Sequence, residues 1–174
     1  MKVVEFVSFK SDKLHFIESK GSAPKETKIK KPNKVYEEPS PYSEENLNSY
    51  FEDWSSDDFE HWTKWKVKHD KMERFFQDLY DKMNHSLNLI VAKELEIKKH
   101  FTNEIPCGIK GLISGKRIVF LLIINSKNVV AKEHYSSVLE KLNRKFIPLK
   151  RIWDIEIKIF NDKQAEKQGF IACF

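Results

Sequence analysis

The sequence contains few cysteines and no long apolar segment. Only two of its 174 residues are cysteines, Cys107 and Cys173, and neither belongs to a CxxC pair or stands near a histidine at metal-ligand spacing. The longest apolar run, residues 118–124, is too short to cross a bilayer. The first residues lack the apolar run of a signal peptide. These absences predict a cytoplasmic protein with reduced thiols and no membrane partner.

The chain also has only a small excess of positive over negative charge. The chain has 31 basic and 26 acidic residues, a formal net charge of +5. This mild bias is compatible with a nucleic-acid partner, DNA or RNA, but many proteins without such a partner share it. An apolar content of 40% is enough for a sizeable core. The length of 174 residues predicts a single domain, 1–174, with a linker or inserted segment at about 25–66.

The predicted linker has two parts of different character. Residues 25–45 alternate lysine with proline, which is typical of a long loop. Residues 44–66 are acidic and aromatic, and Ser43 before two glutamates predicts a helix start. Three tryptophans stand in or beside this stretch: Trp54, Trp62 and Trp65. The acidic neighbours disfavour a base-stacking platform, so these side chains predict packing or a surface for a protein partner, including a second copy of the chain.

Hydrophobic periodicity predicts the remaining elements. Two β-rich segments joined by a short polar turn indicate a hairpin, and a later strand that is apolar at every position indicates burial on both faces. A final strand alternates and is expected near an edge. The predicted order is strand 3–9, strand 14–20, helix 69–99, strand 117–125, helix 129–146, strand 152–160, and a short helix at 164–168 stopped by Gly169. This order predicts an α/β (α+β) fold with a mixed sheet.

The hairpin can be aligned by residue number. If Phe9 pairs with Leu14, Glu5 faces Glu18, and Lys20 lies on the same face because side chains two apart share a face. A slip of one residue would separate these groups. The alternative interpretation is a solvent-facing strip of charged residues on an ordinary hairpin.

Two carboxylates held opposite each other repel, and an adjacent apolar surface increases the cost. A divalent cation, Mg²⁺ or Mn²⁺, would relieve this repulsion, because hard cations bind carboxylate oxygens. The hypothesis is therefore a metal site with Glu5 and Glu18 as ligands and Lys20 as a catalytic cation beside a phosphate.

Glu5 followed by Phe16-Ile17-Glu18-Ser19-Lys20 resembles the PD-(D/E)xK, or restriction-endonuclease-like, nuclease superfamily. More closely, residues 14–24 are similar to an uncharacterised bacterial family that carries an "FIEAKSSAP" string, and residues 81–89 are similar to its later "EKF-x-x-SLN" helix. The resemblance implies a restriction-endonuclease-like core and metal-dependent hydrolysis of phosphodiester bonds in nucleic acid, with Glu5, Glu18 and Lys20 as the catalytic set.

The long helix adds a polar line, because Asp78, Lys82 and Ser86 follow one another at i, i+4 spacing. In the superfamily this helix often faces the site, so Lys82 and Ser86 are candidate phosphate ligands, with Ser22 as a further candidate. An ordinary solvated stripe is the alternative.

Superfamily members usually begin with a helix and a further strand, whereas this chain starts at the hairpin. The second hypothesis is therefore a catalytically inactive module that binds nucleic acid or a protein partner, in phage defence or counter-defence. A homodimeric scaffold built on the tryptophan segment is the third.

Overall fold

The computed structural model describes residues 5–10, 12–24, 30–32, 55–95, 117–125 and 132–170. The chain divides into two compact units, one made of Met1–Pro24 with Phe75–Phe174 and the other of Lys25–Arg74. Both cysteines, Trp54 and the helix start predicted at Ser43 lie outside the described residues. The first unit contains the sheet and the candidate site.

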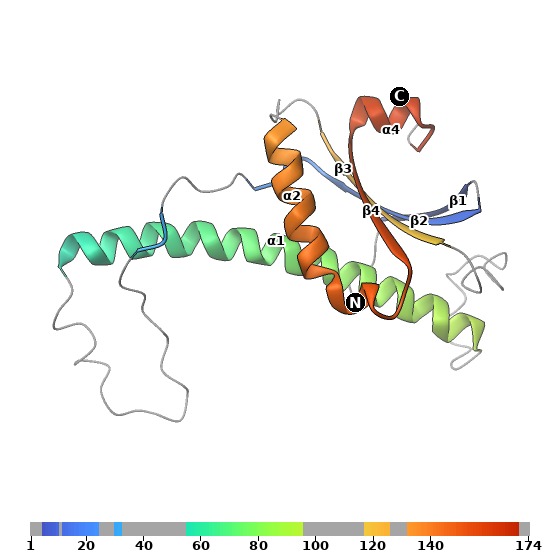
Figure 1. The fold of residues 1–174 in the computed structure, drawn as a ribbon, viewed down its shortest axis with the longest axis horizontal. Coiled ribbons are helices and arrows are strands. Elements are labelled where there is room, and N and C mark those ends of the chain that lie inside the picture. The colour runs from blue at the N-terminus through green and yellow to red at the C-terminus, as the bar shows by residue number, and fades with distance from the viewer. Residues whose placement is uncertain are drawn as a thin grey trace. The chain divides into compact units, whose positions relative to one another are not determined.

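The sheet has four strands in the order β1-β2-β3-β4 (Figure 1). Strands β1 (Phe6–Lys10) and β2 (Lys13–Lys20) form an antiparallel hairpin, and β3 (Arg117–Ile124) and β4 (Ile155–Asn161) are added in parallel. The predicted α/β class and mixed sheet are confirmed. The predicted alignment of the hairpin is also confirmed over β1, where Phe9 pairs with Leu14 and Phe6 with Ile17.

The tight hairpin turn contains one residue in the left-handed backbone conformation. Asp12 takes a φ of 57°, which a short polar side chain tolerates better than most. The strand before this turn is poorly covered, and Phe6 and Phe9 are exposed there. Strand β1 is thus an edge strand, and β2 is the first strand with a covered face.

The central strand β3 is buried on both faces, as its continuous apolar run predicts. All seven residues from Ile118 to Ile124 are buried. On β4, Ile155 and Ile157 are buried, whereas the alternate residues Glu156 and Lys158 are partly exposed. The prediction of a half-exposed edge strand is confirmed.

Helices cover the two faces of the sheet unequally. One face packs against α2 (Lys132–Lys145), the short α3 (Ile147–Lys150) and residues 75–94 of α1 (Ser56–Glu94). The ring of Phe146, between α2 and α3, lies 5.1 Å from the ring of Phe120 and 5.8 Å from that of Tyr80. The other face carries α4 (Asp162–Lys167), where buried Ala165 packs with Ile17 and Leu121 (Figure 1).

The short helix α4 has clear start and stop signals. Asn161 and Gln164 form a capping box, each side chain accepting a backbone N–H of the other residue. Gly169 follows with a φ of 67°, a conformation that glycine adopts without strain. The predicted stop at Gly169 is therefore confirmed. The short helix α3 follows the predicted helix 129–146, and its Pro148 stands in the first turn, where proline fits a helix.

Helix α1 starts earlier than its periodicity predicts, at Ser56 instead of residue 69. Ser55 Oγ accepts the N–H of Asp58, and the Asp58 carboxylate accepts the N–H of Ser55, a reciprocal pairing of the capping-box type that starts a helix. Residues 56–66, which the sequence assigns to the linker, are helical for this reason. In the second unit, Trp65 stacks on His69 at 4.6 Å and Trp62 lies 6.0 Å from Phe59.

Candidate active site

The candidate site begins with a buried acid on an apolar sheet face. Glu18 follows Leu14 and Phe16 on the same side of β2, and it is aligned with Leu122 of β3. Its exposed fraction is 0%. Burying an unpaired carboxylate among such neighbours would cost on the order of several kcal/mol. This position therefore requires partners with positive charge.

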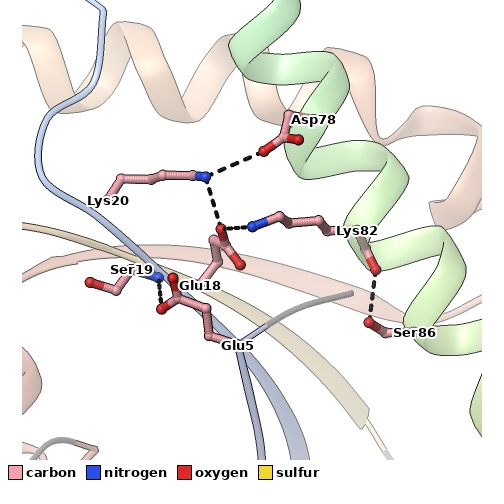
Figure 2. A network of polar contacts seen from close by, with 7 residues as sticks. All are labelled: Glu5, Glu18, Ser19, Lys20, Asp78, Lys82 and Ser86. Atoms are coloured by element: carbon pink, nitrogen blue, oxygen red, sulfur yellow. Dashed lines mark hydrogen bonds and ion pairs between the residues drawn. The ribbon is translucent and has the colours of Figure 1, made fainter. Parts of the chain in front are cut away.

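Two lysines supply that charge from two elements (Figure 2). Lys20 Nζ lies 2.9 Å from Glu18 Oε1, two residues along the same face of β2. Lys82 Nζ, from α1, lies 2.5 Å from the same oxygen. The first contact follows from strand periodicity. The second joins residues 64 positions apart in the chain and exists only because α1 packs on this face.

Asp78 completes the cluster. It stands one helical turn before Lys82, and its Oδ2 lies 3.3 Å from Lys20 Nζ. Lys20 therefore bridges a strand carboxylate and a helix carboxylate (Figure 2). We name Glu18, Lys20, Asp78 and Lys82 the Glu18 cluster. It holds two acidic and two basic side chains, so its charges balance.

The pKa of Lys20 reflects this arrangement. Partial burial lowers it, but the hydrogen bond and the charge of Glu18, followed by those of Asp78, outweigh burial and leave the pKa raised above its ordinary value. Lys20 is thus held as an ammonium at neutral pH, which is the form required to stabilise negative charge on a phosphate.

One oxygen of the cluster lacks a donor. Glu18 Oε2 is buried, and no hydrogen-bond donor of the described residues reaches it. Buried carboxylate oxygens are rarely left so, because the missing hydrogen bond costs about 1–3 kcal/mol. Such an oxygen is a suitable acceptor for a water molecule or ligand for a cation.

Glu5 lies one residue before β1, whose pairing with β2 reaches Phe6 and Ile17, so its predicted pairing with Glu18 lies beyond the paired residues. Glu5 is exposed, and its carboxylate accepts the backbone N–H of Ser19 at 3.1 Å (Figure 2). Strand β1 begins at Phe6 and pairs with β2 only as far as Ile17, so the Glu5 side chain provides an acceptor for a β2 backbone N–H beyond these pairs. Glu5 thus reaches β2 at the residue between Glu18 and Lys20.

The three predicted substrate ligands are placed differently from one another. Lys82 is in the cluster and points at Glu18. The Ser86 hydroxyl donates to the Lys82 backbone carbonyl at 2.8 Å, as serines inside helices often do. Ser22 is exposed just after β2. Asp78 is the residue that the sequence interpretation left out of the site, although its i, i+4 spacing to Lys82 was a usable signal.

No family model, no curated protein and no solved structure matches this chain. Among the described residues, no helix is long and apolar enough to cross a membrane. Within the same residues, no three His, Cys, Asp or Glu side chains gather as a metal-binding group.

Proposed function

We propose that the protein is a metal-dependent phosphodiesterase acting on nucleic acid, with a restriction-endonuclease-like core. The observation that carries this proposal is the buried oxygen of Glu18, which accepts no hydrogen bond from the described residues, next to the ammonium of Lys20. A Glu-x-Lys site needs a carboxylate oxygen that is available to a metal ion, next to a lysine ammonium that is held in place. In this proposal Glu5 and Glu18 hold Mg²⁺ or Mn²⁺, and Lys20 is the catalytic cation.

The oxygens present fit such an ion. Mg²⁺ is commonly bound by only one or two carboxylates, with water completing its shell, so a group of three protein ligands is not required. Glu18 Oε2 is a hard oxygen donor without a hydrogen bond from the described residues. The exposed carboxylate of Glu5, held at the neighbouring backbone N–H, is the second. When bound, the ion would supply Lewis-acid activation of a phosphate and of water.

In this proposal the side chains around the ion have separate roles. Lys20 would stabilise the negative charge that develops on the phosphate. Asp78 holds the Lys20 ammonium from the side away from Glu18 and so orients it. Lys82 and Ser22 are proposed to contact the phosphate backbone, and this requires the Lys82 ammonium to exchange Glu18 for substrate. Ser86 would have to leave a buried position and its bond to the Lys82 carbonyl to join them.

A second candidate is a catalytically inactive module of the same fold that binds nucleic acid or a protein partner. The observation that favours it is the charge balance of the Glu18 cluster. Lys20 and Lys82 already neutralise Glu18 Oε1, so folding does not require a cation there. On this view Glu18 is a buried structural acid.

Metal binding and cleavage separate the two candidates. Saturating Mg²⁺ or Mn²⁺ should raise the thermal midpoint, because a ligand at 100 times its Kd stabilises the folded state by about 2.7 kcal/mol. We expect Glu18→Gln to abolish this rise. Lys20→Ala should keep it, because an ammonium is not a cation ligand.

Cleavage is measured on single- and double-stranded DNA and RNA with Mn²⁺ or Mg²⁺. We expect the wild type to cleave at least one of these substrates and Lys20→Ala and Glu18→Gln to be inactive while folded. Lys71→Gln, at an exposed position of α1, is the charge-matched control and should cleave as wild type does. A folded wild type that neither binds the metal nor cleaves supports the inactive module instead.

A further inference from the structure

A second polar site lies on the face of the sheet opposite the Glu18 cluster. A cavity of 190 Å³ opens over β2, β3 and β4, with Val119 and Leu121 at its base. Lys13 and His15 of β2 line this cavity, whereas Glu18 and Lys20 point to the opposite face, toward α1. The cavity is therefore separated from the Glu18 cluster by the thickness of the sheet.

The cavity is lined by positive charge. Lys10, Lys13 and Lys158 contribute from β1, β2 and β4. The neighbouring carboxylate of Glu156 lies 3.0 Å from Lys13 Nζ and 3.1 Å from Lys158 Nζ. One carboxylate thus serves two lysines, and Lys10 adds a third ammonium. The walls keep an excess of positive charge over an apolar base, where an anion is attracted more strongly than in bulk water.

The wall of the cavity contains a buried histidine, His15, with one ring nitrogen that forms no hydrogen bond with the described residues. His15 is 6% exposed, and its Nδ1 has no hydrogen-bond partner among the described residues. Its ring lies 4.9 Å from the ring of Phe170. Burial lowers the pKa of His15, as do the charges of Lys158, Lys13 and Lys10, while a hydrogen bond with the backbone of Lys13 acts in the opposite direction. The three lysines that line the cavity thus also act on the imidazole.

The far wall is held by the turn after α4. Lys10 Nζ donates to the backbone carbonyl of Gln168 and lies 5.1 Å from the centre of the Phe170 ring. The positive φ of Gly169 turns the chain there, and a Cβ at this glycine would come within 3.2 Å of Lys10 Nζ. The wall is therefore built by specific contacts between residues far apart in the sequence.

We propose that this cavity binds a phosphate group. Its volume is below the range of about 300–1,000 Å³ typical of sites for drug-sized ligands, which suits a single small anionic group. The lysine ammoniums would donate charge-assisted hydrogen bonds to the phosphate oxygens, and the vacant Nδ1 of His15 would gain a partner. The phosphate can come from the free ion or from the 5′ end of a nucleic acid.

The test is an NMR titration of the histidine ring resonances at constant ionic strength. The full chain is titrated with inorganic phosphate, with a 5′-phosphorylated oligonucleotide and with the same oligonucleotide ending in a 5′-hydroxyl. We expect phosphate to shift the His15 resonance to saturation, and chloride at equal ionic strength to leave it unmoved. A response to the 5′-phosphorylated oligonucleotide that the 5′-hydroxyl oligonucleotide does not give identifies a nucleic-acid end as a source, and a response to inorganic phosphate without one to either oligonucleotide identifies the free ion.

Three variants decide the assignment. Lys158→Gln and Lys13→Gln should each weaken phosphate binding by about tenfold or more, because each removes a hydrogen bond to a charged group. Lys71→Gln makes the same charge change at an exposed residue and should bind as wild type does. Binding that is unaffected by both cavity variants, or a His15 resonance that does not respond to any phosphate, overturns the proposal.

Discussion

The ion pair between Lys82 and Glu18 gives the sharpest prediction for stability. Glu18 is fully buried, whereas the side chain of Lys82 is 18% exposed. Replacing Lys82 by methionine preserves the length and apolar stem of the side chain and removes only the ammonium. Breaking a buried ion pair by removing one partner lowers the free energy of unfolding by about 3–5 kcal/mol. Because Lys20 remains at 2.9 Å, we expect Lys82→Met to cost about 3 kcal/mol, the lower end of that range.

The measurement is urea unfolding followed by far-UV circular dichroism. A loss of about 3 kcal/mol lowers the urea midpoint at unchanged slope and the thermal midpoint by about 6–12 °C for a chain of this size. The control is Lys71→Met on the exposed side of the same helix, which should change stability by less than about 0.5 kcal/mol.

A double variant tests whether the cost arises from the pair itself. Glu18→Gln removes the buried charge that Lys82 neutralises, so the double variant should lose less stability than the two single losses added together, with a coupling of about 1–3 kcal/mol. If Lys82→Met is no more destabilising than its control, Lys82 does not neutralise Glu18 in solution, and the argument for a charge-balanced cluster is wrong.

Three further outcomes are expected. Phe120→Ala should lower the free energy of unfolding by about 3–5 kcal/mol in urea, since this ring is fully buried in the central strand; a loss below about 1 kcal/mol would contradict the two-sided burial of β3. The pKa of His15 is lowered in the folded protein. Below a pH of about 6.5 the unfolded chain therefore binds more protons than the folded protein does, so stability falls there but not at higher pH. His15→Gln should therefore show a smaller drop in thermal midpoint between pH 8 and pH 5 than wild type, and equal drops would refute this. Asn161→Ala should cost about 1 kcal/mol through loss of the capping box at α4, and Lys167→Ala at an exposed position of the same helix is the comparison.

The local features of this protein could be predicted from its amino-acid sequence. A continuous apolar run required burial on both faces and so marked the central strand, and alternation on β4 marked an edge strand. The hairpin alignment followed from the length of its turn. Each of these depends on periodicity or turn geometry within a few residues, which a single segment encodes.

The contacts between residues of different helices and strands, in contrast, depend on how the elements pack. Local spacing put Glu18 and Lys20 on one face, but it was the packing of α1 on that face that brought Lys82 and Asp78 to them. In the same way, the parallel alignment of β2, β3 and β4 gathers Lys13, His15 and Lys158 around one cavity. Such contacts depend on which strands are neighbours and which helix covers which face, and these are set by burial of the whole core, not by any one segment.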